Sequence, residues 1–236
     1  MQAIGHFSLV AVFAKTKSQQ KQHQSKVPLL QALGTPNMNP KDIGQAYNEI
    51  THLWEREDFD RSNGVAQHER AIAFVKSRGN ALDVGCGCTG RFIDLLLEKG
   101  FSPEGIDISN KMLRLAKKRH PEIKFHHENI CEWELPKKYD FISAWDSIWH
   151  IPLEQQERVL TKLLSALNSG GICIFSGGGV DEPGDHRDDS MGPEVYYSTL
   201  GVSGFLRVIL DLNCTCRHLE YDQYPELHTY FIVQMA

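Results

Sequence analysis

The chain has 236 residues, 41% of them hydrophobic, and a net charge of −5 with a pI near 6.1. This composition supports one sizeable core and excludes a fibrous, collagen-like or wholly disordered protein, so one catalytic domain is the simplest expectation. The acidic balance gives no general attraction to phosphate backbones, and no basic patch outweighs it. Nucleic acid is therefore not an expected partner.

The six cysteines lack the CxxC spacing of a metal site. Cys214 and Cys216 face the same side of an expected strand, and we interpret them as packed thiols. Reduced thiols are typical of a cytoplasmic protein, which is the location we expect.

Residues 1–37 differ in composition from the rest of the chain. An apolar run at 3–14 is followed by a Lys-, Gln- and Ser-rich stretch at 15–26. No basic residue precedes the apolar run, so it is not typical of a secretory signal, and it is too short to span a bilayer. We expect 1–37 to be a disordered tail or to precede the true start of translation, and we expect the domain to occupy 38–236 without a membrane partner.

The domain is expected to begin with helices. Asn39, Pro40 and Asp42 have the order of an N-cap, a first helical position and a first-turn acid. Apolar residues then recur at helical spacing as far as Trp54, and a second helical run covers 67–76.

A strand, a glycine turn and a helix start follow one another at 81–92. Gly85, Gly87 and Gly90 allow positive φ and the close approach of a ligand, and the free N–H groups of the new helix point to the same place. Asp83 stands directly before this turn. An acid there favours a cofactor that carries an ammonium or sulfonium group over an anionic pyrophosphate.

These residues resemble the first motif of class I S-adenosylmethionine-dependent methyltransferases, acid-x-Gly-x-Gly-x-Gly, at Asp83, Gly85 and Gly87. The third glycine, Gly90, comes one residue late, which is also the GxGxxG spacing of a dinucleotide site. The resemblance covers about 40–236 and implies direct in-line transfer of the sulfonium methyl group to a small-molecule acceptor. An NAD(P)-linked oxidoreductase and a non-catalytic module that binds S-adenosylmethionine remain alternatives.

The alternation of strands and helices continues beyond the turn. Right-handed crossovers then build a parallel sheet. The last two expected strands, 215–221 and 227–234, are joined so tightly that they must be antiparallel. We therefore expect an α/β fold, with a doubly wound, mostly parallel seven-stranded sheet, an antiparallel C-terminal hairpin and helices on both faces. Such a hairpin is typical of methyltransferases and argues against a dinucleotide-binding fold. The other expected elements are strands at 102–108, 123–127, 139–146 and 172–176, and helices at 110–120, 153–168 and 198–212.

Asp107 ends the expected second strand, where a carboxylate can accept hydrogen bonds from both ribose hydroxyls. The resemblance places Asn129 where methyltransferases usually carry an acid for the adenine amino group, with the N–H of Ile130 donating to the ring. Trp133 either stacks on the base or anchors its loop. The cofactor-binding residues expected for S-adenosylmethionine are Asp83, Gly85, Cys86, Gly87, Gly90, Asp107, Ile108, Asn129, Ile130, Trp145 and Tyr47.

The carboxyl end of the expected strand at 139–146 is the expected catalytic rim. Asp146 and His150 are the candidate bases for a hydroxyl or thiol acceptor, with His186 as a third, whereas a neutral amine can react without a base. An acidic, glycine-rich loop is expected at 177–193. It either covers the pocket and selects a cationic or amine-bearing acceptor, holds a divalent metal with Asp146, or is simply solvated. No metal ligand is assigned, and the identity of the acceptor and the oligomeric state are left open.

Overall fold

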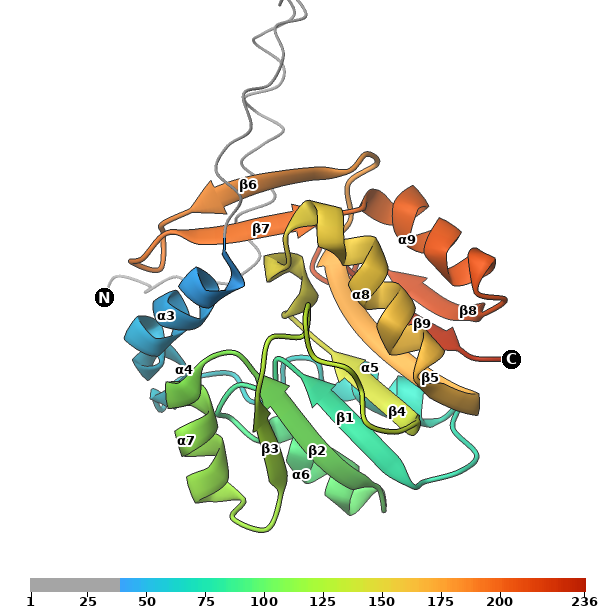
Figure 1. The fold of residues 1–236 in the computed structure, drawn as a ribbon, viewed down its shortest axis with the longest axis horizontal. Helices are drawn as coiled ribbons and strands as arrows, with labels where there is room; N and C mark the ends of the chain where they lie inside the picture. Colours follow the sequence, from blue (N-terminus) through green and yellow to red (C-terminus); the bar gives the residue numbers. More distant parts are fainter. Residues whose placement is uncertain (1–38) are drawn as a thin grey trace, which may run out of the picture.

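The computed structural model describes residues 39–236, so the expectations for 1–37 fall outside the described residues. Within that range lies a seven-stranded sheet with the spatial order β3-β2-β1-β4-β5-β9-β8 (Figure 1). Strands β1 to β5 pair in parallel, and β9 pairs antiparallel with both β5 and β8. The predicted fold class is confirmed. The strands are β1 Asn80–Val84, β2 Ser102–Asp107, β3 Lys124–His127, β4 Tyr139–Ala144, β5 Leu167–Gly178, β8 Thr215–Glu220 and β9 His228–Gln234.

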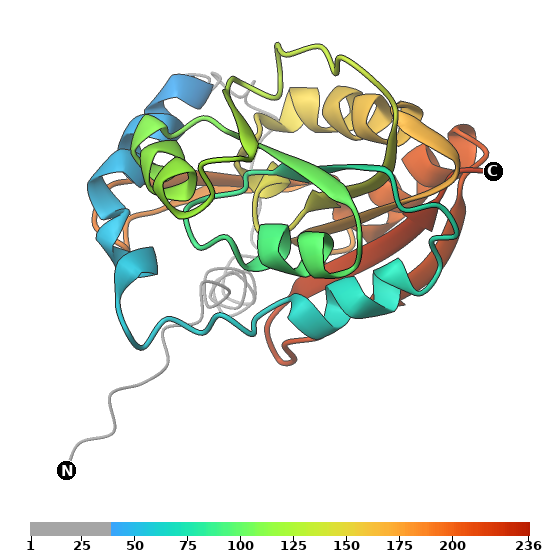
Figure 2. The ribbon, with the colours of Figure 1, turned by 90° about the horizontal axis from the view of Figure 1, so that it is seen from below.

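Helices cover both faces of the large sheet (Figures 1 and 2). Side chains alternate along a strand, so the neighbours Phe141 and Ile142 of β4 enter different hydrophobic cores. Helices α5 and α6 close the core that contains Phe141, and α8 and α9 close the core that contains Ile142. These helices are α5 Val65–Ile72, α6 Arg91–Glu98, α8 Leu153–Ser165 and α9 Gly201–Asp211.

Two helices begin with a side-chain cap, and the one at Asn39 confirms the prediction. The side chain of Asn39 accepts a hydrogen bond from the N–H of Lys41 at the start of α3 (Pro40–Ile50), with Pro40 in the first turn. Ser109 accepts from the N–H of Met112 at the start of α7. Helix α7 spans Asn110–Arg119, and a short helix, α4, spans His52–Glu55.

The boundary between α8 and β5 differs from the prediction. The helix was expected at 153–168 and the strand at 172–176, but α8 ends at Ser165, and Gly170 and Gly171 lie within β5. Gly170 has φ 74°, and the pairing of β5 with β4 shifts register next to it. The glycines therefore mark an irregularity in a strand. Glycine is favoured at such irregularities as well as at the ends of helices.

The prediction of a long loop at 177–193 is wrong. β5 extends to Gly178, and β6 (Gly184–Asp188) pairs antiparallel with β7 (Val195–Thr199) in a separate two-stranded sheet. The charged alternation of β6 resembles a solvated loop in sequence, and its strand character depends on pairing with β7. For the same reason the helical run begins at Gly201 rather than at residue 198.

The β6–β7 hairpin crosses one edge of the molecule, above α3 and the short helix η1 (Ile148–His150) (Figure 1). Trp149 of η1 is buried in a small core with Tyr197 of β7 and Ile43 of α3. The hairpin thus fixes η1, which follows the carboxyl end of β4, against the first helix. None of the helices in the described part of the chain combines the length and apolarity needed to cross a bilayer.

Candidate functional site

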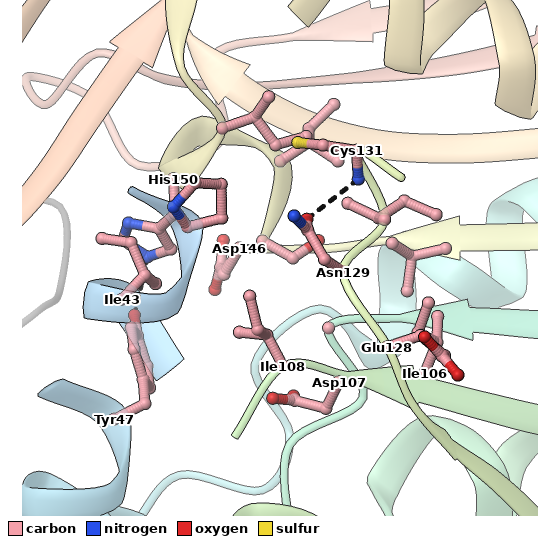
Figure 3. A pocket seen from close by; sticks show the side chains of 17 residues that line it. Ile43, Tyr47, Ile106, Asp107, Ile108, Glu128, Asn129, Cys131, Asp146 and His150 are labelled. Carbon is pink, nitrogen blue, oxygen red and sulfur yellow. Dashed lines mark hydrogen bonds between the residues drawn. The ribbon is translucent and has the colours of Figure 1, made fainter. Parts of the chain in front are cut away.

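A cleft opens at the carboxyl ends of β1, β2 and β4, where a doubly wound sheet binds its ligands. It consists of two adjoining chambers, both bordered by Tyr47, Gly85, Asp107 and Asp146. We call the first the apolar chamber, since much of its wall comes from Ile43, Ile106, Ile108, Ile130, Ile148 and Ile151 (Figure 3). We call the second the glycine-loop chamber, whose further lining includes Trp54, Phe59, Cys86, Gly87, Arg91 and Trp145.

Most of the predicted site residues lie together at this cleft. Both catalytic candidates, Asp146 and His150, border the apolar chamber. Asp83 and Gly90 are the two predicted cofactor-binding residues that line neither chamber. The predicted cofactor residues that do line the cleft are Tyr47, Gly85, Cys86, Gly87, Asp107, Ile108, Asn129, Ile130 and Trp145.

Asp83 lies beneath the glycine turn and not in the cleft. Only 3% of its surface is exposed, and it hydrogen-bonds the side chain of Ser143. Burial raises the pKa of Asp83 to about 7. Ser143 also hydrogen-bonds Nε2 of the buried His68, whose pKa burial lowers to about 3. The acid is therefore part of an internal polar network that supports the turn, and the expectation that it would face a cationic cofactor is corrected.

Gly90 also serves the fold. It caps α6 with φ 74°, and a Cβ atom there would lie 2.6 Å from the His120 ring and 2.7 Å from the Arg119 side chain. The third glycine is thus explained by a left-handed cap and close packing, without any contact to a ligand. Its late spacing consequently carries no argument for a dinucleotide.

The glycine turn itself is held against Asp107. Gly85 and Gly87 have φ of 70° and 57°. The N–H of Gly87 donates to Oδ2 of Asp107 at 2.9 Å, and the N–H of Ser109 donates to Oδ1 at 2.8 Å. Burial raises the pKa of Asp107 above its ordinary value. Each carboxylate oxygen retains a lone pair that can face the cleft.

His150 is a neutral imidazole with an assigned tautomer. The indole N–H of Trp149 donates to its Nε2 at 2.9 Å, so Nε2 carries a lone pair and Nδ1–H donates to the carbonyl of Tyr196 at 2.8 Å. The hydroxyl of Tyr47 lies 2.7 Å from the same Nε2. Burial lowers the pKa of His150 to about 4. The ring is therefore a weak base whose lone pair is already occupied.

We predict that His150 does not titrate between pH 5.5 and 9. Its folded-state pKa of about 4 lies below that range because the buried ring is held neutral. The measurement is a pH series of 15N chemical shifts on histidine-labelled protein, with the His150→Phe variant assigning the signal. A His150 signal that shifts with a midpoint near 6.5 would contradict the assigned tautomer.

Asp146 is joined to a second buried histidine. Its Oδ1 accepts hydrogen bonds from Nε2 of His228 at 3.0 Å and from the hydroxyl of Ser176 at 3.1 Å. On the other side of the His228 ring, Nδ1 lies 2.5 Å from Oδ1 of Asp222. Burial lowers the pKa of His228, but the hydrogen bonds and charges of the two carboxylates outweigh it and raise the pKa to about 9.

The His228 ion pairs predict a specific pH dependence of stability. A histidine that titrates at about 9 when folded and at 6.5 when unfolded stabilises the fold fully below pH 6.5, and this stability is lost as the pH rises toward 9. The loss can reach roughly 3 kcal/mol. Urea denaturation between pH 7.0 and 8.0 measures part of this loss, in a range below the ordinary thiol pKa of about 8.5, and His228→Gln should flatten the slope. Equal slopes in both proteins would show that His228 is neutral.

Comparisons with known proteins point to one family. A sequence profile described as a methyltransferase domain matches residues 81–171, from β1 into β5. An uncharacterized methyltransferase of Bacillus cytotoxicus is 28% identical over 137 residues, which are 55% of this chain and 64% of that protein. A Burkholderia thailandensis 1,6-didemethyltoxoflavin-N1-methyltransferase shares the fold with a TM-score of 0.69 at 14% identity, over 89% of this chain and 94% of that one. An S-adenosylmethionine-dependent methyltransferase from Clostridium acetobutylicum has a TM-score of 0.61 at 14% identity, over 81% of this chain and 99% of that one.

The profile match contains the glycine turn and Asp107, the features that form the floor of the cleft. Residues 81–171 thus match a methyltransferase domain, and the fold is that of solved S-adenosylmethionine-dependent methyltransferases. S-adenosylmethionine is the cofactor that these comparisons support, and the dinucleotide alternative is not favoured. The matched part of the chain spans slightly less than two thirds of the Bacillus methyltransferase, at 64% of its length.

This chain has an amide, Asn129, at the position where methyltransferases usually carry an acid. The Oδ1 of Asn129 accepts a hydrogen bond from the N–H of Cys131 at 3.0 Å (Figure 3), so the amide shapes its own loop while facing the apolar chamber. Trp133 lies outside both chambers, with its ring 4.7 Å from that of His126 and its carbonyl 2.7 Å from Nζ of Lys162. Its contacts are those of a loop anchor.

Sequence reasoning missed Arg91, which borders the glycine-loop chamber. Its guanidinium lies over the rings of Phe59 and Phe92, at 5.6 and 4.5 Å from their centroids. Its Nε is buried and has no hydrogen-bond partner among the described residues. Its place directly after Gly90 could have indicated that Arg91 lies near the turn. It was passed over because the first residue of a helix normally faces solvent.

The remaining candidates lie away from the cleft. His186 of β6 stacks on Tyr197 at 5.2 Å and lines neither chamber. Between residues 39 and 236, no three or more His, Cys, Asp or Glu side chains are grouped so as to hold a metal ion. The acidic stretch, for which a metal site with Asp146 was one of three alternatives, forms part of the β6–β7 hairpin.

Proposed function

We propose that this protein transfers the methyl group of S-adenosylmethionine to a small-molecule acceptor by direct in-line displacement. The observation that carries the proposal is the positive-φ glycine turn bonded to Asp107 at the junction of two chambers. One chamber is apolar enough for an adenine ring, and the other contains a half-buried arginine. The match to a methyltransferase domain and the 1,6-didemethyltoxoflavin bound to the Burkholderia methyltransferase agree with this proposal.

The residues of the cleft fit the cofactor. We assign Asp107 to the ribose hydroxyls and the loop of Asn129 and Ile130 to the adenine edge, within the isoleucine-lined chamber. Gly87 has no atom within 4 Å of an added Cβ, so a ligand can approach its backbone closely. The buried, unpartnered Nε of Arg91 is suited to the carboxylate of the methionine arm.

S-adenosylmethionine supplies an electrophilic sulfonium methyl group when it is bound. The protein's contribution is to hold the acceptor in line with that methyl group and to exclude water. His150 is neutral with an occupied lone pair, and the pKa of Asp146 is held low by His228 despite its burial, so both are weak bases. An acceptor with a free lone pair, such as a neutral amine, suits this site better than a hydroxyl.

We further propose that the catalytic domain occupies residues 38–236 and acts in the cytoplasm. The free thiols of all six cysteines support the location.

Calorimetric titration of the full chain with S-adenosylmethionine, S-adenosylhomocysteine and NAD tests the cofactor. Micromolar binding of the first two without NAD binding is expected, and binding of NAD alone would overturn the proposal. Transfer of a radiolabelled methyl group to a panel of small amines then separates an enzyme from a module that binds the cofactor without turnover.

A further inference from the structure

Asp146 has a backbone conformation that needs an explanation. It is a non-glycine residue with φ 51°, at the carboxyl end of β4. Its N–H donates to the hydroxyl oxygen of Ser176 at 2.7 Å, and that hydroxyl donates back to its Oδ1. Left-handed backbone at such a residue persists only where its surroundings hold it, and it is concentrated at functional sites. The carboxylate borders the apolar chamber and lies between His150 and Asn129 in the view of Figure 3.

The two oxygens of this carboxylate are in different situations. Oδ1 accepts from His228 and Ser176. Among residues 39–236, no hydrogen-bond donor is placed on Oδ2. The side chain is 16% exposed, at the wall that both chambers share. A carboxylate oxygen that no donor of the described residues contacts, at the edge of a mainly apolar cavity, can accept a hydrogen bond from a ligand.

His228 keeps this carboxylate charged. Its side chain is fully buried, and both ring nitrogens lie at hydrogen-bond distance from a carboxylate, Asp146 on one side and Asp222 on the other. Two N–H groups that donate to two carboxylates require the imidazolium form. Asp222 is itself held by the amide of Gln67 at 2.8 Å. The group of three therefore carries one excess negative charge.

The surroundings of Asp146 suit a compact cation. Tyr47 and Trp145 line the cleft beside it, and aromatic faces stabilise an ammonium group. Arg91 is the cation of the glycine-loop chamber and attracts Asp146 electrostatically, but within the described residues no hydrogen bond or ion pair joins the two side chains, so Oδ2 stays open to a ligand. A carboxylate that accepts from an imidazolium is a weak base and a good anionic anchor.

We propose that Oδ2 of Asp146 binds an ammonium group in the cleft, and that His228 and Asp222 are positioning residues for this carboxylate. Two sources have this chemistry: the α-ammonium of the cofactor's amino-acid arm and an amine-bearing acceptor. The assignment of an amine-bearing acceptor as the ligand rests on the proposed function, whereas the ammonium-binding site itself does not.

The Asp146→Asn variant separates the two sources. With the cofactor's ammonium as ligand, the variant binds S-adenosylhomocysteine at least tenfold more weakly, yet binds the analogue without the α-amino group as the wild type does. With an amine acceptor as ligand, both nucleoside affinities are unchanged, and phenethylamine binding in the presence of S-adenosylhomocysteine, followed by NMR, falls at least tenfold. Unchanged binding of all three probes would overturn the proposal. Failure of the wild type to bind S-adenosylhomocysteine would instead count against the proposed function, and phenethylamine alone would still test the site.

Asp222→Asn tests the positioning role without touching the cleft. The asparagine oxygen still accepts from Nδ1 of His228, but the charge is gone, so His228 should lose its proton at a lower pH. We expect the affinity of the probe that depends on Asp146 to fall severalfold at pH 8.5 and to recover at pH 6. An equal loss at both pH values would indicate a purely structural role. The matched control is His68→Asn, which removes another buried histidine that does not hydrogen-bond Asp146 and should show no such pH-dependent loss.

Discussion

Alanine in place of Gly87 is expected to weaken binding of S-adenosylhomocysteine at least tenfold while the chain still folds. The residue has φ 57°, and an added Cβ atom would meet nothing within 4 Å, because it would project into free space at the glycine-loop chamber. The left-handed backbone makes the variant less stable by about 1–2 kcal/mol, and the methyl group occupies the space that the ligand needs. Calorimetry measures the affinity, and thermal denaturation measures the stability.

Gly100→Ala is the matched control. Gly100 has φ 84°, an added Cβ again meets nothing within 4 Å, and the residue lies in the turn between α6 and β2, away from both chambers. It should show a similar loss of stability with unchanged affinity. If Gly87→Ala kept the wild-type affinity, the ligand would not approach this part of the turn.

Asp107→Ala is expected to weaken cofactor binding by about 2 kcal/mol or more, which is roughly a thirtyfold change. The variant loses two charge-assisted hydrogen bonds to the ribose, and it also frees the N–H of Gly87 that the carboxylate holds at 2.9 Å. Titration with S-adenosylhomocysteine gives the affinity. Unchanged affinity would show that the ribose assignment is wrong.

Ser109→Ala separates this loss from a general disturbance. Ser109 caps α7 and donates its hydroxyl to Oδ1 of Asn48, while its backbone N–H would still donate to Asp107. The variant should lose about 1 kcal/mol of stability, as expected for a lost N-cap, and keep its affinity for S-adenosylhomocysteine. A thirtyfold loss of affinity in this control would attribute the Asp107 effect to the loop.

Many of the elements could be predicted from the sequence because they depend on neighbours in the chain. The caps at Asn39 and Ser109 and the positive φ of Gly85 and Gly87 follow from local hydrogen bonds and steric freedom. The antiparallel hairpin at the C-terminus follows from the shortness of its connection. Asp107 could be placed at the cleft because the carboxyl ends of neighbouring parallel strands meet at one edge of a sheet.

The errors occurred where pairing or burial overrides local pattern. β6 has the charge of a solvated loop and becomes a strand only beside β7. Gly90 was predicted to be a ligand-binding glycine, and only the folded chain brings the side chains of Arg119 and His120 against it. Asp83 stands next to the turn in the sequence, but its side chain is buried inside the fold, and this burial raises its pKa to about 7.

By itself the sequence determined the order of strands and helices in the large sheet, the glycine turn and the carboxylate that holds it, since each depends on residues close together in the chain or on the repeated crossover. Only the tertiary structure decided the charges of the cleft. Asp146 meets His228, 82 residues away, and His228 meets Asp222 across the closing turn of the hairpin. Whether a carboxylate or an imidazole is charged depends on its burial and on its partners, and long-range packing sets both.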